Sequence, residues 1–262
     1  LEEKKKFYRD SGESQKYYQE YMMEVQSEED AVWRRSSIKD WKGYYKYDED
    51  KEVNYLVIDG EEVPVNTFAG CDPATDINTK HSDFSVIMAI AIDPDNNLYV
   101  LEYERHRSIP TIGEKSFDGT IVGKKGVVDY IIEMHEKYHC TSSTVEDVAM
   151  NRSIFQALNT ERKRLNKFGI SVIPEKPGGR EKRNKIYSGL SGRFSMGTIH
   201  IRENMFDLIN EILTFGPKMA HDDTIETLFY AQLHAFPPNM VKEKSKKTWF
   251  KPIRKAKNWI IA

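Results

Sequence analysis

The sequence has little that would point to a disulfide scaffold, a membrane protein or a nucleotide-binding loop. Its 262 residues include only two cysteines, Cys71 and Cys140, and their spacing is not that of metal ligands. This usage favours a reducing, intracellular setting. No apolar run approaches the length of a membrane span, and no secretory signal opens the chain. No glycine-rich phosphate loop with lysine occurs, and there is no internal repeat.

Composition predicts a globular protein with a core. Charged residues make up 31% and hydrophobic residues 39%, and the formal net charge is only -2. Such a chain can hold one large domain, or one domain with an appendage. The charge is unevenly distributed, because residues 241–262 carry eight lysines or arginines and one glutamate. The chain begins with Leu1 and not with Met, so we expect a piece of a longer protein.

The first 66 residues are expected to form a helix and a connector. Residues 1–30 are polar with a thin apolar stripe at helical spacing, which predicts a helix. Residues 31–65 mix aromatic and acidic side chains and are expected to hold short strands. The stretch 55–65 predicts a hairpin that turns at Asp59-Gly60.

From residue 67 to residue 240 the pattern predicts one α/β domain with a mixed sheet flanked by helices. We expect strands at 67–72, 84–93, 98–105, 142–149 and 170–175, and a short edge strand at 198–201. We expect helices at 126–138, 152–169, 180–197, 205–216 and 222–236. Gly169 is expected to close the second helix, and the apolar run 84–93 predicts a strand covered on both faces.

Acidic residues occur where three of these elements begin or end. Asp72 ends the first strand, Glu146 lies late in the strand from 142, and Asp222, Asp223 and Glu226 open the last helix. If these elements are neighbours, the carboxylates converge, and clustered carboxylates require a cation. Oxygen ligands suit Mg²⁺ or Mn²⁺, and two such ions about 4 Å apart can hydrolyse a phosphodiester.

Each of these residues also has a structural interpretation. Asp72 precedes Pro73 and can be a turn residue. Asp223 can cap the last helix with Glu226 three residues on. A helical wheel places Asp222 nearer the apolar face than Asp223, so periodicity does not choose between the two.

The order of these segments resembles the nuclease domain of the large terminase subunit of tailed bacteriophages. The resemblance covers roughly residues 67–236 and is carried by "DPATD", "DFSVIMAIAID", "LYVLEYER", "TVEDVAMNRSIFQAL", "EKRNKIYSGLSGRFSMGTIHI" and "HDDTIETL". It implies a ribonuclease H-like fold. It also implies that residues 1–66 follow a missing ATPase domain, that 67–240 form the nuclease domain, and that 241–262 are a basic tail.

The resemblance implies specific site residues. Asp72, Glu146 and Asp223 match the catalytic ligands of two Mg²⁺ or Mn²⁺ ions, with Asp222, Glu226, Asp76 and Asp83 as further candidate ligands and His221 as an auxiliary residue. Glu226 stands where aspartate is common, and Asp222 rivals Asp223. Lys182, Arg183 and Lys185 are expected to contact DNA phosphates or to form a solvated helix face, with Arg152 and Arg180 as weaker candidates.

The implied function is an endonuclease that cuts concatemeric double-stranded DNA during viral packaging in the host cytoplasm. Its implied partners are double-stranded DNA, the upstream ATPase domain, the portal of the empty head and the small terminase subunit. No membrane partner is expected. Two alternatives stay open: another ribonuclease H-like nuclease, such as a junction resolvase, and a non-catalytic DNA-binding or head-docking module. The tail can be a solubilising end, a DNA contact or a docking segment. Its Trp249, Phe250, Ile253, Trp259 and Ile260 favour docking or packing.

Overall fold

A computed structural model describes residues 32–74, 84–117, 119–147, 152–176, 182–216, 219 and 221–239. The helix expected over residues 1–30 and the basic tail at 241–262 lie outside these ranges. In the part of the chain that is described, no helix is both long and apolar enough to cross a bilayer.

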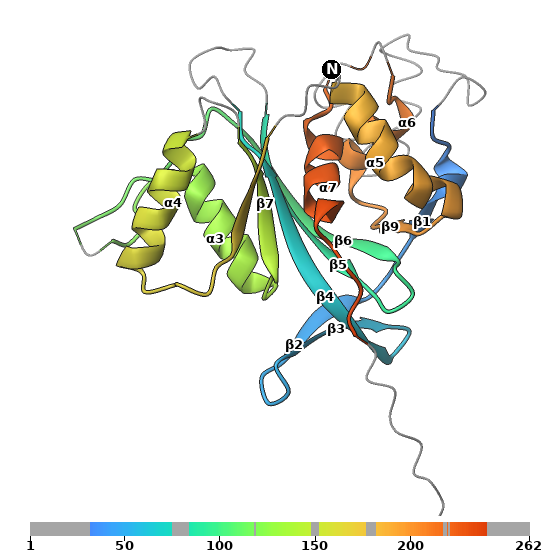
Figure 1. Cartoon of the computed structure of the whole chain (residues 1–262), viewed down its shortest axis with the longest axis horizontal. Coiled ribbons are helices and arrows are strands. Elements are labelled where there is room, and N and C mark those ends of the chain that lie inside the picture. Colours follow the sequence, from blue (N-terminus) through green and yellow to red (C-terminus); the bar gives the residue numbers. More distant parts are fainter. Residues whose placement is uncertain are drawn as a thin grey trace, which may run out of the picture.

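Three long antiparallel strands form the middle of the sheet: β4 (Glu61–Asp72), β5 (Phe84–Ile92) and β6 (Leu98–Arg107). Beyond β4 the sheet continues with β7 (Ser142–Glu146), parallel to β4, and β8 (Val172–Glu175), parallel to β7. The strand order β6-β5-β4-β7-β8 is that of the ribonuclease H-like fold. The predicted class, an α/β fold with a mixed central sheet flanked by helices, is confirmed (Figure 1).

The first described segment adds further strands to this sheet: β1 (Ile38–Asp40), which follows a short 3₁₀ helix η1 (Arg35–Ser37), β2 (Tyr44–Asp48) and β3 (Val53–Ile58). The expected hairpin at Asp59-Gly60 is confirmed; both turn residues have positive φ, as a two-residue hairpin turn requires. Strand β4 runs on from Glu61 through the expected domain boundary at residue 66.

One expectation about a strand's place in the sheet and one about a helix end are wrong. The strand expected at the sheet edge is β9 (Ile199–Ile201), and it is an inner strand because it pairs with β1 as well as β6. Helix α4 (Arg152–Arg164) ends five residues before Gly169. The chain leaves this helix through Asn166, whose φ of 55° is the left-handed conformation that ends many helices.

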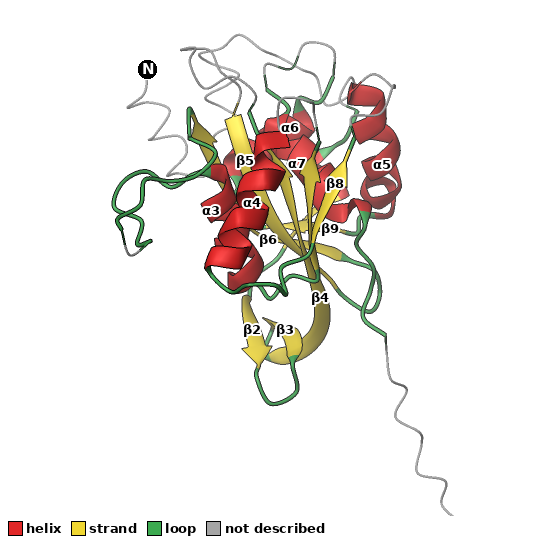
Figure 2. Cartoon of the chain, turned by 60° about the vertical axis from the view of Figure 1, so that its left-hand side comes forward, coloured by secondary structure: helices red, strands yellow, loops and turns green. Residues whose placement is uncertain are grey.

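Helices cover both faces of the sheet. Helices α3 (Val127–Lys137) and α4 lie against one face, and α5 (Lys182–Met196), α6 (Phe206–Leu213) and α7 (Asp223–Leu233) lie against the other (Figures 1 and 2). Alternate residues of β5 enter two separate cores. Met88 and Ile90 pack toward α7, and Ile87 and Ala89 pack toward α3. The prediction of a strand buried on both faces is therefore confirmed.

Candidate metal-binding site

Strand alternation turns Asp72 and Glu146 toward the same helix. Successive side chains of a strand point to opposite faces. In β4, Cys71 belongs to the core beneath α3 and α4, so its neighbour Asp72 faces α7. In β7, Val145 belongs to that same core, so Glu146 also faces α7. Because β7 pairs beside β4 in parallel, both carboxylates lie at the same end of the sheet.

Gly70 allows α7 to lie directly on β4. A Cβ atom at Gly70 would come within 2.5 Å of the Ala231 amide nitrogen and 2.6 Å of the Thr227 carbonyl oxygen. No residue with a side chain fits this separation. The close approach brings the first turns of α7 over the end of β4, where Asp72 lies. A glycine inside an apolar strand is the local sequence signal for such contact.

The electrostatics of Asp72 show that carboxylates from all three elements converge. Asp72 is 7% exposed. Burial raises the pKa of Asp72 well above its usual range, and the nearby charge of Glu226 raises it further. Glu146 and Asp223 also raise the pKa of Asp72, while Lys182 lowers it. We call the group Asp72, Glu146, Asp222, Asp223 and Glu226 the acidic cluster.

Two lysines of α5 balance part of this charge. The Lys182 ammonium pairs with Asp222 at 2.8 Å and forms a short contact with Glu226. Lys185 pairs with Glu226 at 3.3 Å. Burial tends to lower the pKa of Lys182, but the carboxylates of Glu226 and Asp72 outweigh burial and raise it. Lys182 therefore remains charged within the cluster.

Tyr230 connects one of these lysines to Glu146. Its side chain is fully buried. Lys185 donates a hydrogen bond to the Tyr230 hydroxyl at 2.7 Å, and this hydroxyl lies 2.6 Å from Glu146 Oε1 and 3.2 Å from Glu226 Oε1. Burial raises the pKa of Tyr230, and the neighbouring Glu226 and Glu146 raise it further, so the hydroxyl remains a donor.

Glu211 of α6 frees the start of α7 from capping by its own aspartates. The buried Glu211 carboxylate accepts hydrogen bonds from the backbone N–H groups of Thr224 and Ile225 at 2.8 and 2.9 Å. The alternative that Asp223 caps the helix is wrong: the N-cap is Asp222, and it makes no side-chain cap bond. Burial raises the pKa of Glu211 to about 7, although Arg105 opposes this.

A second group of residues lies beside Asp223. The Phe84 amide donates to Asp223 Oδ2 at 3.4 Å, and His221 Nδ1 lies 4.0 Å from the same oxygen. The guanidinium groups of Arg105 and Arg107 lie 3.7 and 4.1 Å from the centre of the Phe84 ring. Arg105 is also held by Glu211 at 3.1 Å, whereas Arg107 is exposed at the end of β6.

The chemistry of the donors fits a hard divalent cation. The acidic cluster offers only carboxylate oxygens, it is largely buried, and its five carboxylates outnumber the two ammonium groups. Such donors suit Mg²⁺ or Mn²⁺. Across the described residues, however, no three acidic, histidine or cysteine side chains are arranged for direct coordination of one ion. The donors therefore converge without forming a finished coordination shell, and Lys182 lies among them.

The structure brings together Asp72, Glu146, Asp222, Asp223 and Glu226, with His221 beside Asp223. Glu226, which the sequence offered only as a further candidate ligand, pairs with both Lys182 and Lys185. Lys182 and Lys185 pair with carboxylates, and Arg183 is half-buried on the same helix. Asp76, Asp83, Arg180 and the Arg152 side chain lie outside what the structure describes.

Sequence reasoning did not identify Tyr230, Glu211, Arg105, Arg107 and Phe84 as site residues. Tyr230 and Phe84 read as ordinary core positions. Glu211 had a usable signal, because it is a carboxylate within the apolar run of a helix that precedes the acidic one. Arg105 and Arg107 also had a sequence signal, because a strand that ends in Arg-His-Arg presents two cations on one face.

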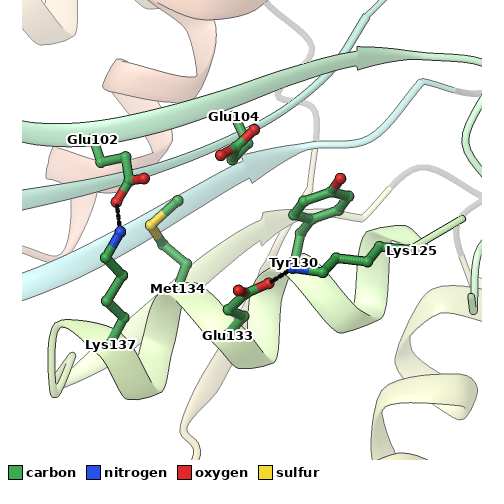
Figure 3. Close-up of a pocket in the computed structure, with 7 residues that line it drawn as sticks. All are labelled: Glu102, Glu104, Lys125, Tyr130, Glu133, Met134 and Lys137. Carbon is green, nitrogen blue, oxygen red and sulfur yellow. Dashed lines mark hydrogen bonds and ion pairs between the residues drawn. The ribbon is translucent and has the colours of Figure 1, made fainter. Parts of the chain in front are cut away.

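A pocket on the other face of the sheet has paired charges of its own. It lies between β6 and α3 and is lined by Glu102, Glu104, Lys125, Tyr130, Glu133, Met134 and Lys137 (Figure 3). Lys137 pairs with Glu102, and Lys125 with Glu133. The Lys137–Glu102 pair joins α3 to β6, whereas Lys125 and Glu133 both lie at α3.

Comparison with known proteins finds similar structures but no matching family model and no matching curated protein. The large terminase nuclease of the thermophilic phage G20c, solved with bound zinc, is 16% identical with a TM-score of 0.47, over 76% of this chain and 95% of that one. The nuclease domain of the Thermus phage P74-26 large terminase is 16% identical with a TM-score of 0.41, over 74% and 90%. RuvC of Thermus thermophilus is 15% identical with a TM-score of 0.36, over 64% and 92%.

Proposed function

We propose that this chain is the nuclease domain of a viral DNA-packaging terminase, which cuts concatemeric double-stranded DNA with two Mg²⁺ or Mn²⁺ ions. The observation that carries the proposal is the convergence of buried carboxylates from β4, β7 and α7 at one end of the sheet. The ordered sequence segments that resemble the terminase nuclease supply the biological role. The ATPase domain, the portal and the small terminase subunit belong to this proposal as partners.

In this proposal the residues divide the work between the ions and the DNA. Asp72, Glu146 and Asp223 bind the ions, with Glu226 and Asp222 as further donors. When bound, the ions supply charge stabilisation and an activated water for in-line attack on a phosphodiester. His221, whose Nδ1 lies 4.0 Å from Asp223 Oδ2, is an auxiliary residue beside this ligand.

Phosphate contacts are assigned to cations that reach solvent. Arg107 is exposed beside Asp223's neighbour Phe84, and the Lys182 side chain is 44% exposed. With Arg183 they can hold the DNA backbone without reading its sequence. The Lys185 side chain is only 14% exposed and is bound to Glu226 and Tyr230, which favours a role inside the cluster over a DNA contact.

Cleavage of supercoiled and linear DNA with Mg²⁺, with Mn²⁺ and with chelator tests the function. Asp72→Asn should abolish cutting and leave the fold intact, because it removes a charged ligand at nearly constant shape. Asp93→Asn is the control, since Asp93 is a buried aspartate at the opposite end of β5 and should not affect cutting.

Three results would change the proposal. Cutting by Asp72→Asn at the parent rate would remove Asp72 from the site. Preference for a four-way junction over linear duplex would favour a resolvase. Metal-independent DNA binding without any cutting would favour the non-catalytic module.

A further inference from the structure

Tyr230 of α7 is held between β7 and α5 by its contacts with Glu146 and Lys185. Its side chain is fully buried, and its ring packs edge-on against Phe229 with the ring centres 5.5 Å apart. Two torsions fix a tyrosine hydroxyl once the ring is packed. The hydroxyl is therefore a fixed hydrogen-bonding group between a strand end and a helix.

The hydroxyl proton is directed at Glu146 by the lysine on its other side. Lys185 has donors only, so the 2.7 Å contact occupies a lone pair of the Tyr230 oxygen. The hydroxyl then donates its single hydrogen bond to a carboxylate. Glu146 Oε1 at 2.6 Å is the nearer acceptor, and Glu226 Oε1 lies at 3.2 Å.

We propose that Tyr230, polarised by Lys185, is a positioning residue that orients the Glu146 carboxylate for a divalent cation. The inference rests on the proposed function, because it concerns the same acidic cluster. Glu146, the last residue of β7, pairs with Glu175 of β8, whereas the pairing of β7 with β4 ends at Val145. A hydrogen bond of 2.6 Å to a carboxylate is charge-assisted and is a strong restraint on side-chain orientation.

Calorimetric titration of Mn²⁺ into DNA-free protein tests the inference. Tyr230→Phe removes one oxygen and keeps the buried ring. Loss of a hydrogen-bonding partner behind a metal ligand costs about 10- to 100-fold in metal affinity, and we expect a loss in this range. Tyr138→Phe is the matched control, because the Tyr138 hydroxyl also donates to a glutamate, Glu102, at 2.6 Å, on the other face of the sheet. It should leave Mn²⁺ affinity unchanged.

Kinetics separate positioning from general damage. In Tyr230→Phe the Mn²⁺ concentration needed for half-maximal cutting should rise with the dissociation constant, and saturating Mn²⁺ should restore most of the maximal rate. Unchanged Mn²⁺ affinity in Tyr230→Phe would overturn the inference, and so would an equal loss in Tyr138→Phe or a parent that binds no Mn²⁺. A parent that binds Mn²⁺ tightly through Tyr230 but cuts no DNA would overturn the proposed function and leave the inference intact.

Discussion

Replacing Gly70 with alanine should separate α7 from β4 and disable the acidic cluster. The added Cβ would lie 2.5 Å from the Ala231 nitrogen, 2.6 Å from the Thr227 oxygen and 2.9 Å from the Ala231 Cα, and all three atoms are backbone. Backbone atoms of a packed helix cannot rotate away as a flexible side chain can. Restoring ordinary van der Waals separation requires α7 to retreat by roughly 1 Å.

The retreat has separate costs in stability and in catalysis. Overpacking of a core costs about 1–3 kcal/mol, so the free energy of unfolding, measured by urea denaturation, should fall by that amount. Asp223, Glu226 and Tyr230 all move with α7, whereas Asp72 stays on the strand. A misplacement of about 1 Å can cost about 100-fold in rate. The cleavage rate at saturating Mn²⁺ should therefore fall by about 100-fold.

Gly192 provides the control, because a Cβ there would meet no atom within 4 Å. Gly192→Ala lies inside α5 and should stabilise the protein by about 0.5–1 kcal/mol without changing the cleavage rate. The reasoning about Gly70 is refuted if Gly70→Ala cuts DNA within twofold of the parent rate while its free energy of unfolding has fallen as expected.

Two further predictions concern protonation and DNA binding. Burial lowers the pKa of His135 to about 4 in the folded protein. In the unfolded chain the same imidazole is protonated below about pH 6.5. Between pH 7 and pH 5 the parent should therefore lose about 2 kcal/mol more free energy of unfolding than His135→Gln, and an equal loss in the two proteins would contradict this. Arg107→Ala should weaken duplex binding and lower the slope of log affinity against log salt by about 1. Lys46→Ala is the control, because Lys46 lies on β2, far from the cluster, and it should change neither duplex affinity nor the salt slope (Figure 1). An unchanged slope in Arg107→Ala would exclude a phosphate contact by Arg107.

The sequence predicted the elements of the fold well because its long strands and helices have strong local signals. The apolar strand β5, the meander with β6 and the hairpin at Asp59-Gly60 all follow from periodicity and turn chemistry. The positions of Asp72 and Glu146 at strand ends follow in the same way. Local signals could not show that β9 lies between β1 and β6, because β9 pairs with segments about 160 and about 100 residues away in the sequence.

The partners of the acidic residues were harder to predict than the residues themselves. A basic run such as 182–185 is typical of a DNA contact or a solvated helix face, and both interpretations ignore what packs beside it. In the structure, Lys182 and Lys185 turn toward Glu226 because α5 lies next to α7. Glu211 likewise has a meaning only once α6 meets the start of α7. Such contacts depend on how helices pack, which periodicity alone does not specify.

The charge balance of the cluster ties cation binding to DNA binding in the proposed function. Five carboxylates face two ammonium groups, and Asp72 is so unfavourably placed that its pKa is raised. A phosphodiester is also anionic, so it is repelled by the cluster until additional positive charge is present. In the proposed function, bound divalent cations therefore strengthen DNA binding at this end of the sheet. By thermodynamic reciprocity, bound DNA strengthens the binding of the cations. The two lysines reduce the repulsion without removing it, which preserves the attraction for cations while limiting the cost of burying so many carboxylates.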